Sequence, residues 1–128
     1  MRRTYLKSVL GGATLAIAQA APDGHAIELH VDLAVDPAKG REMIDVFHKT
    51  FRPAASRQPG FIDAKMLKFR APKRGEAPPG ANYRFVLVFA TEEQRLAWVA
   101  TPVHQKTWPL IANTLTNPNY TALLYDLA

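Results

Sequence analysis

The stretch YRFVLVFA, residues 83–90, is apolar on both faces of the strand that it predicts. Successive side chains of a strand point to opposite faces of the sheet. One face carries the larger side chains Tyr83, Phe85, Leu87 and Phe89, and the other carries Val86 and Val88. This composition is typical of a strand at the centre of a sheet that is covered on both sides. We therefore expect residues 83–90 to form a central strand, buried on both faces.

Three other stretches have the features of strands. Apolar and polar residues alternate along residues 27–35, which is the period of a strand with two chemically different faces. A second strand is expected over about residues 61–70, after the turn QPGF, and a last one over residues 120–127. A polar loop, APKRGEAPPGA, separates the second strand from the third.

An amphipathic helix is predicted between the first two strands. Asp36 and Pro37 suit its N-cap and its first helical position. Its apolar side chains recur at helical spacing, namely Met43, Ile44, Phe47 and Phe51. Pro53 should bend or loosen the last turns, because proline has no backbone N–H to donate.

A second helical region follows the third strand. Thr91 and Gln94 form a capping-box pair at its start. The TP pair at residues 101–102 should restart it as a second helical piece. Pro109 should kink that piece or open a further turn.

The order strand, helix, strand, strand, helix, strand predicts an α+β domain with ferredoxin-like βαββαβ topology and an antiparallel four-stranded sheet. A chain of 128 residues has room for a single domain of this kind. We place it at residues 27–128, after a flexible N-terminal segment at residues 21–26.

Residues 1–20 have the features of a signal peptide. A basic start, MRRTYLK, precedes the apolar run VLGGATLAIA, which is too short to span a bilayer. The triplet AQA at residues 18–20 suits cleavage by a signal peptidase. The pair Arg2 and Arg3 resembles the twin-arginine export signal, and an ordinary secretory signal is the alternative. We expect export to the periplasm or the extracellular space.

Charge and composition limit the classes of partner that the protein is expected to bind. The chain has a net charge of +5, with 16 basic and 11 acidic residues. Removing the leader removes three basic residues, which leaves thirteen against eleven acidic ones and a net charge of +2. We therefore expect no nucleic-acid binding and no stable membrane insertion. The chain has no cysteine, which excludes disulfides and thiolate chemistry.

The element order, the PGF turn after the first helix and the segment AWVATPVHQKTWP together resemble the antibiotic biosynthesis monooxygenase family. The likeness covers residues 27–127. It implies a homodimer in which two sheets pair into a dimeric α/β barrel, with a mostly apolar pocket in each subunit. Family members include oxygenases that oxidise phenols or quinols without metal or flavin, and a haem-degrading branch. The resemblance therefore implies a monooxygenase of a small aromatic or quinol ligand, with no cofactor and no metal.

Trp98 and His104 are the candidate catalytic residues. The haem branch has a pocket Trp at the position of Trp98 and an axial His ten residues later, where this chain has Trp108. Other members have a His six residues after that first position, which His104 matches. An imidazole with an ordinary pKa near 6.5 can accept a phenolic proton. The alternative is that both tryptophans are core anchors and that His104 packs at a helix start.

The predicted pocket combines these residues with histidines and aromatics of the neighbouring elements: His30, Phe47, His48, Phe85, Trp98, His104 and Trp108. His48 is equally compatible with a half-exposed helix position. Glu28, His30 and Asp32 share one strand face, which must be solvated, line a dimer or form a polar network. Their side chains span about 13 Å along the strand, too far to converge on one metal ion.

Two further alternatives follow from the same residues. A non-enzymatic module could use the pocket to bind a hydrophobic ligand, and haem could bind through His30 or His104. A basic cluster on the second strand and its loop either protects a sheet edge or binds an anion. Its members are Lys65, Lys68, Arg70, Lys73 and Arg74.

Overall fold

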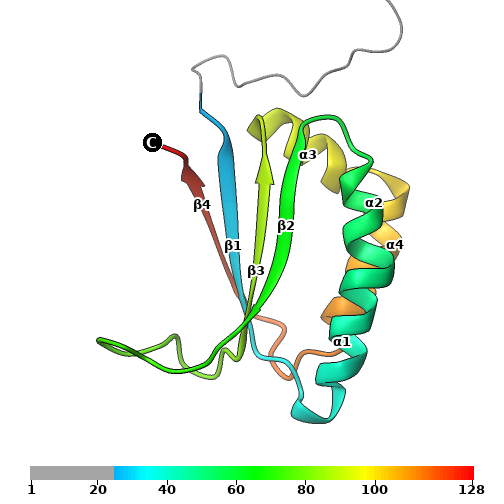
Figure 1. Cartoon of the computed structure of the whole chain (residues 1–128). Helices are drawn as coiled ribbons and strands as arrows, with labels where there is room; N and C mark the ends of the chain where they lie inside the picture. Colours follow the sequence, from blue (N-terminus) through cyan, green and yellow to red (C-terminus); the bar gives the residue numbers. More distant parts are fainter. Residues whose placement is uncertain (1–24) are drawn as a thin grey trace, which may run out of the picture.

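A four-stranded antiparallel sheet forms one layer of the protein, and the helices form a second layer on one of its faces (Figure 1). The computed structural model describes residues 25–128. The expected signal peptide at residues 1–20, and residues 21–24 of the expected flexible segment, lie outside these described residues. No helix of the described part is long and apolar enough to cross a membrane.

The strands are β1 (Ile27–Leu33), β2 (Phe61–Lys68), β3 (Tyr83–Phe89) and β4 (Thr121–Asp126). Their order in the sheet is β2-β3-β1-β4, and every neighbouring pair is antiparallel. The expected ferredoxin-like α+β topology is confirmed, and β3 lies inside the sheet as its sequence predicts. β2 and β4 are the edge strands.

The first helical region is a continuous stretch of four pieces. A short 3-10 turn, η1 (Pro37–Lys39), leads into α1 (Gly40–Val46), a π-helical turn η2 (Phe47–Phe51) and α2 (Arg52–Ser56). Asp36 caps its start, because its carboxylate accepts from the N–H of Ala38 at 2.9 Å. The expected loosening near Pro53 takes the form of the π-helical turn immediately before α2.

The second helical region consists of α3 (Glu92–Val99) and α4 (Pro102–Ala112). Thr91 caps α3 by accepting from the N–H of Gln94 at 3.0 Å. The reciprocal half of the capping box does not form, since Gln94 Oε1 is buried without a partner. Pro109 does not end the helix: α4 continues through it to Ala112, although Pro109 has no N–H to donate to the preceding turn.

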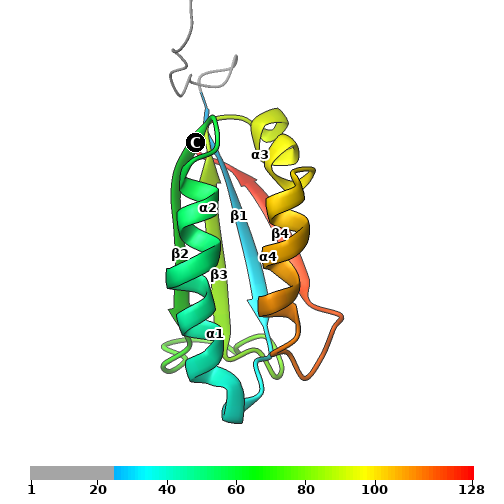
Figure 2. The ribbon, with the colours of Figure 1, turned by 90° about the vertical axis from the view of Figure 1, so that its right-hand side faces the viewer.

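The two helical regions lie side by side over one face of the sheet (Figure 2). The core fills the space between the two layers, and its largest fully buried side chains are Trp98, Phe47, Phe51, Phe89, Leu33, Met43 and Leu87. No helix of residues 25–128 covers the opposite face of the sheet, which we call the uncovered face (Figure 1). Its register aligns Val86 with His30 and Val88 with Glu28. Both valines are buried nevertheless, at 2% and 7% exposure, so β3 is buried on both sides as expected.

Candidate functional site

A cavity of about 470 Å³ lies between the sheet and the second helical region. Strands β1 and β3 supply Leu29, Val31, Phe85 and Leu87 to its wall. The helices supply Phe51, Glu92, Arg95, Trp98, Val99, His104 and Trp108. Tyr120, Ala122 and Leu124, from β4 and the residue before it, complete the lining. We call this space the aromatic cavity.

Phe51 is the centre of the aromatic wall. Its ring makes edge contacts with the rings of Trp98 and Trp108, at centroid distances of 5.6 and 5.9 Å. It also meets the His104 ring at 6.1 Å and the Phe85 ring at 5.3 Å. The rigid rings thus support one another, and the π-helical turn that ends at Phe51 brings the first helical region to the cavity.

The break between α3 and α4 brings Trp98 and His104 together although they belong to different helices. Thr101 caps α4 by accepting from the backbone N–H of His104 at 3.2 Å, which fixes His104 in the first turn. The Trp98 and His104 rings meet edge to face at 5.0 Å and 89°. One turn later, the Trp108 ring lies nearly parallel to the His104 ring, at 11° and 6.5 Å.

His104 is the titratable group of this aromatic wall. Burial lowers the pKa of its imidazole, and the positive charge of Arg95 lowers it further. Nδ1 is buried and has no hydrogen-bond partner. A lowered pKa keeps the imidazole neutral at pH 7, which is the form that can accept a proton.

Trp98 belongs to the core and to the cavity wall at once. Its side chain is 1% exposed, and it is among the largest fully buried residues. Its Nε1 is nevertheless a buried donor without a partner. Buried polar groups are nearly always hydrogen-bonded, so an unpaired indole N–H beside a cavity is a feature that a bound acceptor can satisfy.

Glu92 and Arg95 form an ion pair in the cavity wall. The sequence alone does not identify this pair. Arg95 Nε and Nη2 donate to the two carboxylate oxygens of Glu92, both at 2.7 Å. The Arg95 side chain is 14% exposed and that of Glu92 35%. The feature of the sequence that indicates the pair is their separation of three residues on a helix. That separation allows pairing, but it is equally typical of a solvated helix surface.

The structure places the other predicted pocket residues elsewhere. Phe47 is fully buried in the core and His48 is exposed, their rings touching at 5.1 Å. Neither lines the aromatic cavity. His30 lies on the uncovered face, so it and His104 stand on opposite sides of the sheet and cannot share one ligand. Phe85, Trp98, His104 and Trp108 are the predicted residues that the structure brings together around the cavity.

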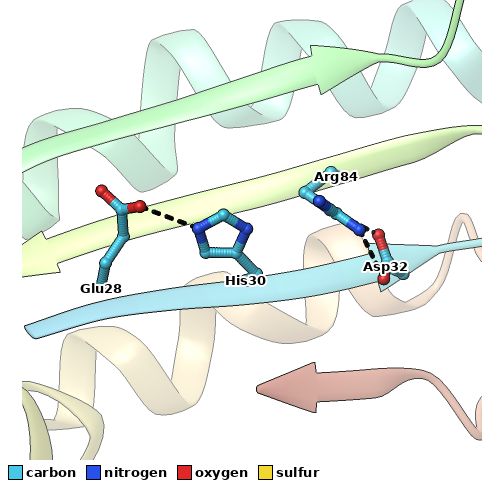
Figure 3. A network of polar contacts seen from close by, with 4 residues as sticks. All are labelled: Glu28, His30, Asp32 and Arg84. Carbon is cyan, nitrogen blue, oxygen red and sulfur yellow. Dashed lines mark hydrogen bonds and ion pairs between the residues drawn. The ribbon is translucent and has the colours of Figure 1, made fainter. Parts of the chain in front are cut away.

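The polar residues of β1 form two pairs on the uncovered face (Figure 3). Glu28 and His30 are joined by a hydrogen bond of 2.9 Å. Asp32 accepts from Arg84 Nε and Nη2, at 2.8 and 3.1 Å, and this bond raises the pKa of Arg84. This arrangement matches the expected polar network. Within residues 25–128 no three His, Cys, Asp or Glu side chains are grouped so that they could hold a metal ion.

A second cavity, of about 390 Å³, lies under the loop between β2 and β3. Four basic side chains line it, Lys68, Arg70, Arg74 and Arg84, together with the acidic Asp32 and Glu76. Lys68 lies on the edge strand β2 and is exposed. The position of β2 agrees with the protection of a sheet edge by lysine.

No protein-family model and no curated protein matches this sequence. Solved structures do match its fold. A candidate antibiotic biosynthesis monooxygenase from Bordetella bronchiseptica is 12% identical, with a TM-score of 0.65 over 81% of this chain and 98% of its own. A dimeric ferredoxin-like protein of unknown function from Jannaschia is 16% identical, with a TM-score of 0.64 over 80% and 98%.

An enzyme is among these structural neighbours. A variant of SnoaB, a cofactor-independent oxygenase from Streptomyces nogalater, is 17% identical, with a TM-score of 0.59 over 80% of this chain and 91% of its own. Folds of this kind carry many functions, so identities this low establish architecture and leave activity to the site. The chain thus shares the ferredoxin-like α+β fold of these proteins, among which are an oxygenase and candidate monooxygenases.

Proposed function

We propose that the protein is a cofactor-independent monooxygenase that oxidises a small phenol or quinol in the aromatic cavity. The observation that carries the proposal is a half-buried imidazole, His104, whose pKa is lowered and whose ring stands among the aromatic side chains of the cavity. The shared fold with SnoaB, which is a cofactor-independent oxygenase, supports the same reading.

In the proposed reaction the substrate supplies the electrons. His104 takes the hydroxyl proton, and the electron pair stays on oxygen, which makes the aromatic ring electron-rich enough to react with O₂. One oxygen atom of O₂ enters the product. The other leaves as water with two hydrogens of the substrate, so no external reductant is needed. The tryptophan and phenylalanine rings orient the flat substrate and keep bulk water from the anion.

Oxygen uptake with a panel of quinols tests this proposal. We expect saturable oxygen consumption, and we expect His104→Ala to lower turnover by about 10²-fold or more, because proton transfer to a placed base contributes that much. His48→Ala is the matched control, since His48 is exposed outside the cavity. Saturable quinol binding with no oxygen consumed would instead identify a non-enzymatic binding module.

We further propose that two copies pair through the uncovered face and form the dimeric barrel. Val86 and Val88 are buried at the centre of this face, and Leu67, Leu123 and Tyr125 around them are 44%, 47% and 50% exposed. A single chain gains nothing from exposed apolar side chains on such a surface. The Jannaschia neighbour, which has the same fold, is a dimer.

We also propose that the protein is exported through the twin-arginine route. The support is the Arg2 and Arg3 pair, the mild apolar run after it and the AQA triplet. Replacing both arginines by lysine in the full chain should trap the precursor inside the cell. Unchanged export of that variant would favour the ordinary secretory route.

A further inference from the structure

We propose that Arg95 is an anion-positioning residue of the aromatic cavity and that the cavity selects acidic hydroxyarenes, phenols or hydroxyquinones, which it holds as oxyanions. This inference rests on the function proposed above, because it concerns the same cavity. It goes further by naming the ionisation state of the ligand and the residue that selects it.

The first support is the way in which Arg95 is held. Its side chain is only 14% exposed, and Glu92 fixes it through Nε and Nη2. The hydrogen bonds to Glu92 use Nε and Nη2, so Nη1 takes no part in this pair, and Arg95 lines the cavity. A bidentate pair costs an arginine much of its rotamer freedom before any ligand arrives. The available N–H groups are therefore already oriented.

The second support is the charge of the lining. Arg95 is the one permanent cation among the described residues of the cavity wall, and most of the other lining residues are apolar. The side chain of Glu92 is more exposed than that of Arg95, so water screens its charge more. An anion that leaves water for an apolar cavity needs a compensating partner. The less exposed member of the pair is the cation, so the pair favours a negative ligand group.

The third support is the electrostatic effect of Arg95 on the base, which lines the same cavity. The positive charge of Arg95 acts on the His104 ring and lowers the pKa of its imidazole. The same charge lowers the pKa of a phenol bound beside it, since a cation favours the anionic form. The hydroxyl proton passes to the His104 ring, and the electron pair remains on the phenolate oxygen, which the positive charge of Arg95 stabilises. Arg95 thus adds to the effect of burial on the base and stabilises the anion that proton transfer forms.

The test uses 4-nitrophenol, whose phenolate absorbs visible light, and its methyl ether 4-nitroanisole, which cannot ionise. We expect the protein to lower the pKa of bound 4-nitrophenol by about 1 or more. In the double variant Glu92→Gln/Arg95→Met the pKa of the bound probe should return toward that of the free probe, whereas 4-nitroanisole should bind as before. Removing Glu92 together with Arg95 avoids leaving an unpaired carboxylate in the wall.

Two further variants sharpen the result. Arg95→Lys keeps the charge and should retain part of the lowered probe pKa. Arg52→Met is the matched control, because Arg52 also pairs with a carboxylate, that of Asp63 at 3.1 Å, but does not line the cavity. Its bound probe should behave as with the wild type.

Wild-type protein alone also gives an answer if the double variant does not fold. Binding of 4-nitrophenol should then tighten as the pH rises through the pKa of the probe, while binding of 4-nitroanisole stays constant. A bound probe that remains neutral, an equal probe pKa in wild type and double variant, or no saturable probe binding would each overturn the proposal. A probe pKa that depends on Arg95, without any oxygen uptake, would support anion selection and would contradict only the proposed monooxygenase activity.

Discussion

His104 shows how one side chain acquires a chemical property from three neighbours. Thr101 fixes its backbone at the start of α4, Trp98 covers one side of its ring, and Arg95 adds a positive charge nearby. Desolvation and a like charge both disfavour the imidazolium form, so their effects on the pKa add. The imidazole is therefore neutral at pH 7 because of its surroundings. The exposed His48 has none of these three neighbours, and its ring contacts Phe47 instead.

The lowered pKa of His104 predicts a specific dependence of stability on pH. The folded pKa lies below the ordinary value of about 6.5, so the unfolded chain takes up the proton first as the pH falls. The contribution of neutral His104 to stability is therefore complete above about pH 6.5 and is lost as the pH falls through the folded pKa. Urea unfolding between pH 7.5 and about pH 5 should show this loss.

His104→Gln should abolish that part of the pH dependence, and His48→Gln should preserve it. Equal losses of stability in wild type and His104→Gln over this interval would contradict the lowered pKa. Direct NMR titration of the His104 ring gives an independent measurement of the same quantity.

Part of the site could be predicted from residue types and spacing. The short distance along the chain between Trp98, His104 and Trp108 predicted an aromatic surface with one base, and the structure groups these side chains around one cavity. The prediction that His30 lines the pocket is wrong. Side chains alternate along a strand, so His30 points away from the face of Leu29 and Val31, which line the cavity. Arg95 could not be singled out, because a charged residue on a helix is usually solvated, and only tertiary packing makes it a cavity residue.

Among the elements, the QPGF turn joins α2 to β2 along the chain and packs against α3 of the second helical region. Gly60 has a φ of +86°, which favours glycine, and a Cβ added there would overlap the side chain of Gln94 on α3. The turn therefore packs directly against the residue that precedes Arg95. Arg95 itself lines the cavity, so the turn lies next to the helix that forms this part of the cavity wall.

Gly60→Ala should therefore destabilise the protein by more than the backbone strain alone, which is about 1 to 3 kcal/mol. Gly75→Ala is the matched control, since Gly75 has a φ of +74° but open space around it. Gln94→Ala should recover the part of the loss that comes from overlap with the end of the Gln94 side chain, while the overlap with its Cβ, at 2.9 Å, remains. Urea unfolding of the single and double variants measures each part, and equal losses for Gly60→Ala and Gly75→Ala would show that the overlap costs nothing.

The type and order of the elements followed from the sequence, while their details did not. Alternation and helical periodicity predicted all four strands and both helical regions within a few residues of their ends. The π-helical turn at Phe47–Phe51 has no local sequence signature apart from the nearby Pro53. Pro109 predicted a kink or a further turn, but α4 continues through it and ends three residues later.

On the scale of the whole molecule, the proposed dimer forms through the uncovered face of the sheet. We expect the wild-type protein to be a dimer by light scattering, and Leu123→Lys to be a monomer, because its charge would enter the paired sheets. Leu110→Lys is the matched control: Leu110 is 43% exposed and Leu123 47%, but Leu110 lies on α4 in the helical layer. A wild-type protein that is monomeric at micromolar concentration would contradict the proposed dimer.

Strand β4 has a consequence for how a ligand reaches the cavity. Every one of its residues is exposed, it pairs only with β1, and its inner side chains Ala122 and Leu124 close one wall of the aromatic cavity. Local opening costs least where few apolar contacts must break. In a single chain, transient fraying of β4 from the sheet edge opens this wall, so the backbone amides of the strand report the rate of that opening. In the proposed dimer Leu123 and Tyr125 lie between the two sheets, and pairing therefore slows the fraying. A ligand that contacts both β4 and α4 slows this opening and therefore dissociates more slowly.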